Sequence, residues 1–353
     1  MKKKGIVSVV IMSCLLLLNA MDSNVEIYGS AISSEEEYEG ADFEYPIVPG
    51  TEEWDKLGSV ANKVAACRIP QDILSKMTNE QLIDAILDFP FLYDIFAYST
   101  EEEGVKSLEY ICDAYLELLN RDDAKDSLVE TMNQRSKTRS IDQSISDEIK
   151  NDALSILILS QDDFEDSISE EDISIIAEAA TIVETVEAGT YASRATYLST
   201  PNDEDVLAYI YTCSHTTAYH RERDEEYAET YGVELIRTGT CKYNCHSYAW
   251  YSTSDSNSYW IPNPEPYMTD GSYKKVLSGL NTSSLNAGKG DVVVYGSTSA
   301  ATHSALLIGG GTGEPLATRY VYSKWGALGV FKHRVSVVPA GYDTTTMSVW
   351  SEN

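Results

Sequence analysis

Two side chains in the C-terminal part of the chain are of the types that nucleophilic thiol catalysis requires. Cys245 follows Tyr243 and Asn244 at the expected start of a helix. If Asn244 caps that helix, Cys245 lies in its first turn, where unpaired backbone N–H groups and the helix dipole favour a thiolate. The same N–H groups, with Asn244 and Tyr243 beside them, are expected to form the oxyanion side of the site. His303 opens an apolar run and is the expected general base.

The segments around these residues follow a recognisable order. A helix beginning at Asn244-Cys245 precedes a strand opened by Gly290-Asp291, and His303 opens the next strand. This order resembles the papain-like superfamily, in particular the NlpC-type cell-wall peptidases and the CHAP amidases, over about residues 240–335. The resemblance implies a short helix carrying the cysteine, packed on a small antiparallel sheet. It also implies amide hydrolysis through a Cys acyl-enzyme, with a peptide or peptidoglycan-like substrate.

The third member of the expected triad departs from that pattern. In the families named, a polar residue on the strand after the histidine orients the imidazole. Here that strand ends in Tyr322-Ser323-Lys324, without His, Asn, Asp or Glu at the expected place. Ser323 is the candidate, and His333 on the following strand is a less favoured one. A water or a backbone carbonyl in this role stays open, so the dyad is better supported than the triad.

An aromatic and proline-rich stretch follows the expected cysteine helix. It contains Trp250 and Trp260, with several tyrosines and prolines between and after them. The structural interpretation is an ordered loop that covers the core. The functional interpretation is a substrate wall formed by Trp250 and Trp260, since aromatic faces suit sugars and peptide side chains.

The cysteine count bears on both disulfides and metals. Five cysteines follow the N-terminal segment, and an odd number in an exported protein leaves one thiol over. One partition pairs Cys67 with Cys112 and Cys213 with Cys241, and leaves Cys245 free. Zinc is the alternative, because Cys213-x-His215 and Cys241-x3-Cys245-His246 hold soft ligands. The spacing of the second pair is unusual for zinc, so we expect neither a metal nor another cofactor.

The N-terminus and the charge indicate the compartment and exclude some partners. Three lysines followed by an apolar run from Ile6 to Leu18 predict a signal peptide over residues 1–31, and hence a secreted protein. No other run is long enough to span a membrane. Residues 1–205 hold 43 acidic and 15 basic side chains, against 13 and 11 in residues 206–353. This acidic surface argues against nucleic acid as a partner; nothing indicates the oligomeric state.

The elements expected to position these residues divide the chain into two parts. Residues 32–50 are acidic with Gly and Pro, which predicts a flexible linker. Apolar positions at three- and four-residue spacing predict an all-helical domain over 51–190, with a capping box at Thr78 and Gln81. Helices there are expected around the following residues: Trp54 to Cys67, Leu82 to Phe89, Val105 to Leu119, Ile149 to Leu159 and Ile173 to Val183.

The second part, residues 191–353, reads as the papain-like hydrolase domain. Strand-like runs are Val206–Tyr211, Gly290–Tyr295, Ser304–Ile308, Arg319–Tyr322 and Val330–Val335. One short helix is expected, beginning near Cys245. The fold class is therefore α+β.

Two other functions compete with a hydrolase. A secreted binding or interaction protein would use the same scaffold with an inactive or disulfide-bonded Cys245. A zinc-stabilised structural domain would use the Cys and His side chains as ligands. The helical part is compatible with an inhibitory pro-region, a targeting module or a scaffold, and its residues do not select among these.

Overall fold

Side-chain caps set where the N-terminal helices begin. The Thr51 hydroxyl accepts a hydrogen bond from the Trp54 N–H at 3.2 Å, and Thr78 and Gln81 form the predicted capping box. The elements that follow are α2 (Glu52–Lys56), α3 (Val60–Ala66), α4 (Gln71–Leu74), α5 (Asn79–Leu87), η3 (Leu92–Phe96), α6 (Glu101–Ile111), α7 (Asp113–Leu119), α8 (Ala124–Thr138) and α9 (Ile145–Leu159).

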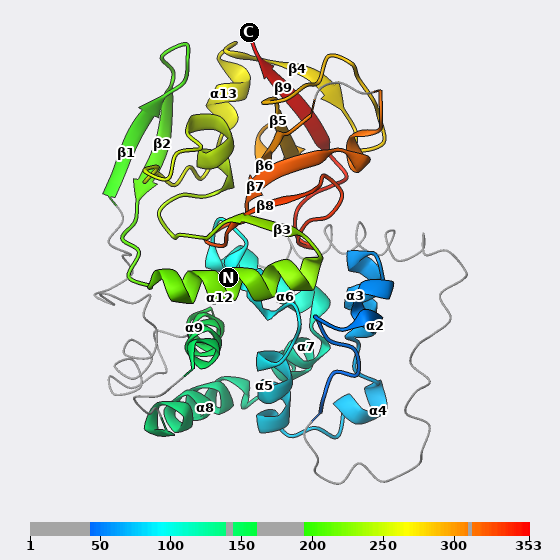
Figure 1. Ribbon diagram of the computed structural model, residues 1–353. Helices are drawn as coiled ribbons and strands as arrows, with labels where there is room; N and C mark the ends of the chain where they lie inside the picture. Colours follow the sequence, from blue (N-terminus) through cyan, green and yellow to red (C-terminus); the bar gives the residue numbers. More distant parts are fainter. Residues whose placement is uncertain (1–42, 139–143, 161–193, 310–312) are drawn as a thin grey trace, which may run out of the picture. The chain divides into compact units, whose positions relative to one another are not determined.

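The computed structural model describes residues 43–138, 144–160, 194–309 and 313–353 (Figure 1). The predicted signal peptide, the helix expected at Ile173–Val183 and the domain boundary at 190–191 lie outside these ranges. All described residues belong to one compact unit, 41–353. Within the described ranges, no helix combines the length and apolar character that crossing a bilayer requires.

The second half of the chain is built on antiparallel strands. A two-stranded sheet pairs β1 (Arg194–Ser199) with β2 (Asp205–Ile210). A seven-stranded sheet has the order β3-β8-β7-β6-β5-β9-β4, and its adjacent strands pair antiparallel. Its strands are β3 (Glu234–Arg237), β4 (Tyr273–Ser278), β5 (Val292–Ser297), β6 (Ala300–Leu307), β7 (Tyr320–Lys324), β8 (Val330–Arg334) and β9 (Met347–Glu352). The mixed α+β class is thereby confirmed.

The five predicted strand runs correspond to β2, β5, β6, β7 and β8. Each combines β-branched or aromatic residues with burial, and the first five residues of β5 are buried without alternation because both faces of this central strand are covered. The strands β1, β3, β4 and β9 were not predicted. Short elements complete this half: the π-helical turn η4 (Ser247–Tyr251), α13 (Glu265–Thr269) and η5 (Leu316–Thr318).

The expectation of a single short helix in this half was wrong. A fifteen-residue helix, α12 (Thr217–Tyr231), begins at the Thr216 cap and ends at Gly232 in the left-handed region. Its buried positions recur at helical spacing but are aromatic or charged, and therefore give no apolar signal: Tyr219, His220, Arg223, Asp224, Tyr227 and Tyr231.

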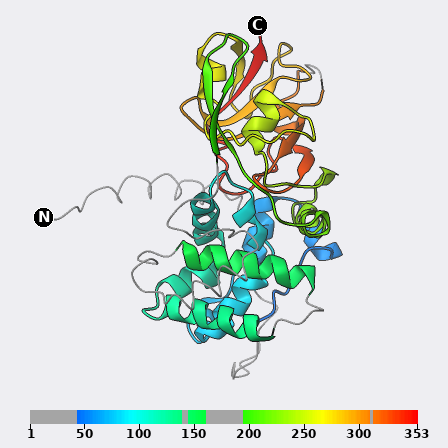
Figure 2. The same cartoon turned by 90° about the vertical axis from the view of Figure 1, so that its left-hand side faces the viewer.

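Helix α12 joins the two halves. Figures 1 and 2 show it between the N-terminal helices and the strands. On one side the Tyr227 and Tyr231 hydroxyls donate to the buried Asp94 carboxylate at 2.6 and 2.8 Å. On the other, Tyr227 packs edge-on against Trp325. The N-terminal helices therefore share a core with the sheet-bearing half through α12.

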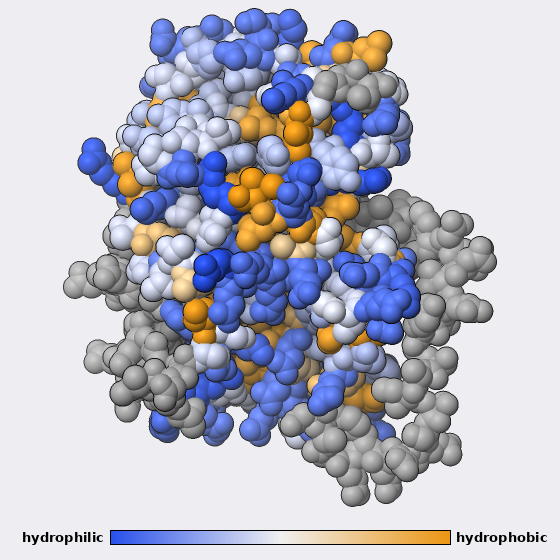
Figure 3. Space-filling model, viewed as in Figure 1, coloured by the Kyte–Doolittle hydropathy of each residue, from blue (hydrophilic) through white to orange (hydrophobic). Residues whose placement is uncertain are grey.

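Hydrophilic and apolar residues occupy different parts of the surface. On the face seen in Figure 3, hydrophilic residues cover much of the helical part, and apolar residues gather around β3, where Ile236 is 42% exposed.

Candidate functional site

Asn244 sets the position of the candidate nucleophile. Its side-chain oxygen accepts the Ser247 N–H at 3.1 Å, which is the predicted helix cap. The same side chain also pairs with both backbone groups of Ile261, accepting from its N–H at 3.2 Å and donating to its carbonyl at 2.8 Å. Cys245 is thus the first residue of a helical turn that is tied to the following loop, and this turn packs against β6 and β7.

The Cys245 thiol is free but closed off from solvent. It forms no disulfide and is 2% exposed. Burial raises the pKa of the thiol to about 12, while the backbone N–H groups of Ser304 and His246 and the nearby Lys324 lower it. In this arrangement the sulfur is protonated at neutral pH, although groups that favour a thiolate already surround it.

His303 lies on β6, opposite Tyr295 of β5. Because β6 begins at Ala300, His303 is its fourth residue and does not open the strand as predicted. Its ring stacks on Tyr342 at a centroid distance of 4.2 Å and contacts Tyr295 at 5.1 Å. The side chain is fully buried and neither ring nitrogen has a hydrogen-bond partner. Burial, followed by the neighbouring His333 and His246, lowers its pKa well below the usual range. The ring is therefore neutral and keeps an unused lone pair.

The two predicted catalytic side chains are both buried and have neighbours in common, but they do not bond to each other; with Ser304 and Tyr342 we call them the Cys245 centre. The N–H that favours the Cys245 thiolate belongs to Ser304, the residue after His303. Tyr342, which stacks on His303, has a raised pKa caused first by burial and then by Cys245. A hydrogen bond between the sulfur and the imidazole is absent, since both His303 nitrogens are unpartnered.

The expectation that Ser323 orients His303 needs correction. The His333 Nδ1–H donates to the Arg334 carbonyl at 2.9 Å, which leaves Nε2 to accept from the Ser323 hydroxyl at 2.6 Å. Because β7 and β8 are neighbours in the sheet, the Ser323 hydroxyl donates its one proton to His333 and has none left to donate to His303. Stacking on Tyr342, which had no distinguishing signal in the sequence, is what restrains the His303 ring.

The other residues predicted for the site are buried and pack behind it. Trp250 and Trp260 are 5% and 8% exposed, so neither forms the expected open substrate wall in this arrangement. The Trp250 N–H donates to the Ser304 hydroxyl at 2.9 Å, and that hydroxyl also contacts His246 Nδ1 at 2.9 Å. Tyr243 is buried beneath Lys324, whose ammonium lies 5.1 Å from the ring centroid.

A segment of the helical half covers the Cys245 centre. We call residues 96–99 the covering segment. Its carbonyls and hydroxyls bond to four residues of the sheet-bearing half: Phe96 O accepts from Ala327 N–H (2.9 Å), Ala97 O from the Tyr342 hydroxyl (2.5 Å), Tyr98 Oη from Gly341 N–H (2.9 Å), and Ser99 Oγ from Asn244 Nδ2 (3.3 Å). Two of these partners, Asn244 and Tyr342, touch the nucleophile's helical turn or the base.

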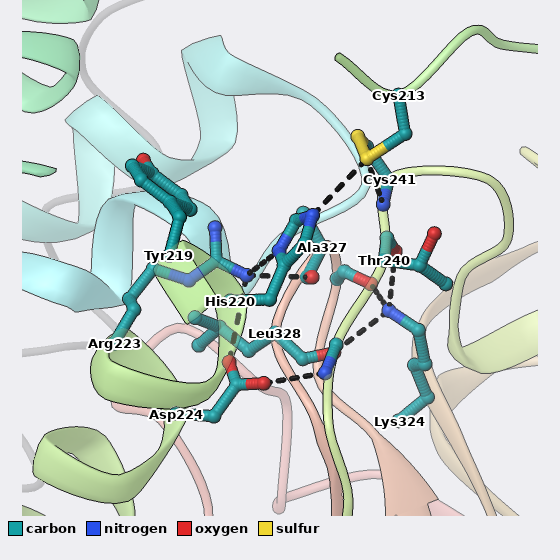
Figure 4. Close-up of polar contacts among 12 residues, drawn as sticks. Cys213, Tyr219, His220, Arg223, Asp224, Thr240, Cys241, Lys324, Ala327 and Leu328 are labelled. Carbon is teal, nitrogen blue, oxygen red and sulfur yellow. Dashed lines mark hydrogen bonds and ion pairs between the residues drawn. A yellow bond between two sulfur atoms is a disulfide. The ribbon is translucent and has the colours of Figure 1, made fainter. Parts of the chain in front are cut away.

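A second polar cluster lies beside this centre (Figure 4). Lys324 is fully buried and donates to three carbonyls, those of Thr240, Gly326 and Leu328, at 2.9, 2.7 and 2.7 Å. Burial lowers its pKa to about 7, and the nearby Asp224 acts in the opposite direction. By holding Thr240, Lys324 positions the loop that leads into Cys245.

The cysteine partition is confirmed in part. Cys213 and Cys241 form a disulfide, and Cys245 is free as expected. Cys67 and Cys112, for which a pairing was considered, are both free and buried. Burial raises the pKa of each to about 12, so they behave as small apolar side chains.

The disulfide also bears on the metal alternative. Cys213, His215, His220 and Cys241 place one ligand atom each within 4.8 Å of one another, a set that includes neither Cys245 nor His246. However, the two sulfurs are bonded to each other. His220 Nδ1 faces the Arg223 guanidinium at 3.1 Å and must accept, so its N–H points at the Cys213 sulfur at 3.2 Å. This arrangement does not fit a metal ion.

Removing the disulfide should lower stability. Replacing Cys213 and Cys241 together with serine is expected to reduce the free energy of unfolding by about 3 kcal/mol, because the bond closes a loop with a sequence separation of 28. Urea denaturation of oxidised wild type and of the double variant measures the difference. Wild type reduced with a dithiol should match the variant, and equal stability of oxidised wild type and variant would contradict the expectation.

Comparisons of the chain with models of protein families, with curated proteins and with solved structures found no match. The resemblance to the papain-like superfamily therefore stays a prediction.

Proposed function

We propose that this protein is an exported thiol hydrolase that cleaves an amide bond, with Cys245 as nucleophile and His303 as general base. The observation that supports the proposal is that the two side chains have neighbours in common. A free thiol begins an Asn-capped helical turn, with the backbone N–H of Ser304 at its sulfur. The preceding residue, His303, is a neutral imidazole with unpartnered nitrogens that stacks on Tyr342.

The proposed reaction needs only these groups, the substrate and water. A ring nitrogen of His303 takes the thiol proton, and the Cys245 sulfur attacks the amide carbon. Backbone N–H groups near the start of the helical turn stabilise the oxyanion. The carbon–nitrogen bond breaks, and the leaving amine takes the proton from His303. Water then gives a proton to His303 and attacks the thioester, which releases the acid and restores the thiol.

A peptide, in a protein or in peptidoglycan, is the substrate class that this chemistry serves. The aromatic side chains around the centre suit peptide or sugar contacts once exposed. The acidic N-terminal half, with 43 acidic and 15 basic side chains before residue 206, argues against tight binding to an anionic cell wall. We therefore include both a wall and a protein substrate in the test.

Two observations favour a different function. The raised pKa of Cys245 and the absence of a bond to His303 are the features expected of an inactive scaffold. A secreted binding protein is therefore the second candidate, in which the same centre serves only packing.

The two candidates differ in whether substrate cleavage depends on Cys245. Wild type should release amines from purified cell wall or from casein only slowly, because Cys245 is buried, and Cys245→Ala should release none above background. Cys67→Ala is the matched control, since Cys67 is also a free, buried cysteine but lies in the helical half. Two outcomes would favour the binding protein. One is activity that is retained in Cys245→Ala. The other is the absence of amine release both by wild type and by a chain whose covering segment is displaced.

A further inference from the structure

We infer that the covering segment, residues 96–99, is an internal inhibitor that keeps the Cys245 centre closed until it is displaced. This inference rests on the proposed hydrolase function and assigns the helical half a role in it. The helical half then acts as a regulatory part of the enzyme, held against the site by defined contacts.

The contacts of the segment concentrate on groups next to the reacting atoms. Ala97 presents its peptide carbonyl to the hydroxyl of Tyr342, whose ring stacks on His303. Ser99 accepts from the Asn244 amide, on the residue directly before Cys245. A substrate must reach the buried Cys245 past groups that the segment holds, so we expect substrate binding to require displacement of the segment.

Glycines allow the backbones to approach this closely. A Cβ on Gly326, whose φ is +49°, would lie 2.4 Å from Phe96 O and 2.5 Å from the Ala97 carbonyl carbon. A Cβ on Gly341 would meet the Tyr98 hydroxyl at 2.7 Å. A side chain at either glycine would collide with the segment, so the segment and these two loops pack in direct contact.

The segment is also held from the helical side. Just before it, the Asp94 carboxylate is fixed by the hydroxyls of Tyr227 and Tyr231. Just after it, the Thr100 hydroxyl caps α6 by accepting the Glu103 N–H at 3.2 Å. Gly104 of α6 packs directly against η3, where a Cβ would lie 2.2 Å from the Ile95 carbonyl oxygen.

Displacing the segment should convert an inert thiol into a reactive one. Burial is the largest cause of the raised pKa of Cys245, whereas the N–H groups of Ser304 and His246 and the Lys324 charge act to lower it. Readmitting water removes the first effect and leaves the others, so the thiolate fraction at neutral pH rises.

Gly104→Ala tests the inference from a position outside the candidate machinery. The new methyl group would collide with the Ile95 backbone and push η3 and the covering segment away from the sheet-bearing half. We expect iodoacetamide at pH 7 to alkylate Cys245 at least about tenfold faster than in wild type, the effect of lowering a thiol pKa by one unit. Mass spectrometry of the labelled peptides reports each cysteine separately.

The chain carries its own controls for this experiment. Cys67 and Cys112 are free and buried within the helical half, so they react early only if that half unfolds. Gly288→Ala is the matched substitution, because nothing lies within 4 Å of a Cβ at that position, and it should leave every labelling rate unchanged.

The outcomes separate the inference from the proposed function. Faster labelling of Cys245 alone, together with faster release of amines from casein or cell wall, supports both. If Cys245 is labelled selectively but no amine is released, the segment covers a thiol that is not catalytic. The inference about the segment then holds, and the hydrolase proposal fails. A folded Gly104→Ala chain whose Cys245 reacts at the wild-type rate overturns the inference.

If all three thiols of Gly104→Ala react at similar rates, the substitution has unfolded the helical half, and a milder variant is needed to test the inference. Tyr98→Phe with Ser99→Ala removes the bonds to Gly341 and Asn244 without adding any atom. In this variant Cys245 should react faster than in wild type while Cys67 and Cys112 stay protected. Equal Cys245 rates in the double variant and wild type overturn the inference.

Discussion

His303→Asn should reduce amide hydrolysis by about 10²- to 10⁴-fold, the usual contribution of a positioned general base. The neutral imidazole is the group in the Cys245 centre with an unused lone pair, since both of its nitrogens lack partners. An amide side chain at this position keeps a polar group but has no basic nitrogen. The rate of amine release by the full chain, opened by Gly104→Ala, measures the loss.

His333→Asn is the matched control for this experiment. His333 is also buried, and burial lowers its pKa as well, but its nitrogens are occupied by Ser323 and Arg334. Its replacement should cost stability and change the hydrolysis rate by less than about tenfold, because it takes no part in proton transfer. Equal losses in the two variants, at equal thermal stability, would remove His303 from the role of base.

Acidification from pH 7 to pH 4.5 should strongly destabilise the folded protein. Burial lowers the pKa of His246 and of His333 to about 4 and that of His220 to about 2, and it lowers the pKa of His303 well below 6.5. The unfolded chain binds protons below about pH 6.5, and the folded chain does so only near the lowered values. Stability is therefore present above pH 6.5 and lost as pH falls towards 4.

The size of the effect follows from the number of histidines. A lowering from 6.5 to about 4 corresponds to about 3 kcal/mol for each of His246 and His333. Buried acids oppose the trend: burial raises the pKa of Asp94 to about 7, and it raises those of Asp224 and Glu226. These acids gain protons in the folded state as pH falls. Four histidines outweigh them, so the net change is a loss.

Urea unfolding at a series of pH values tests this expectation. The free energy of unfolding should fall between pH 6.5 and 4.5, and the slope should decrease by up to about 1.4 kcal/mol per pH unit in His333→Gln, which has one histidine fewer. The glutamine keeps a polar group near Ser323. A stability that stays level across this range would contradict the lowered histidine pKa values.

Local patterns were sufficient for several features of the fold and the site. The Asn244 cap, the Thr78–Gln81 capping box and the strands carrying His303 and Ser323 depend on neighbouring residues along the chain. The Cys213–Cys241 bond was one pair of the partition suggested by the cysteine count, which also paired Cys67 with Cys112, and these two are free. The caps and strands were predicted correctly because such patterns act over a few residues.

Helix α12 is an element that local patterns did not predict. Its buried face carries Tyr227, Arg223 and Asp224, which are polar by type and become core residues only with their partners. Tyr227 needs Asp94, 133 positions earlier, and Arg223 needs the Ala327 carbonyl, 104 positions later. No property of residues 217–231 alone identifies those partners, because burial of a polar group is favourable only when its hydrogen bonds are formed.

The sequence by itself determined the reactive residue types and part of their local setting: a cysteine at the start of an Asn-capped turn, and a histidine within a core strand. Only the tertiary structure decided that Ser323 bonds to His333, that Tyr342 stacks on His303, and that residues 96–99 close the centre. The physical reason is distance along the chain. Caps and strands arise from neighbours, whereas partner choice and exclusion of water arise from segments as far apart as Ala97 and Tyr342, 245 positions.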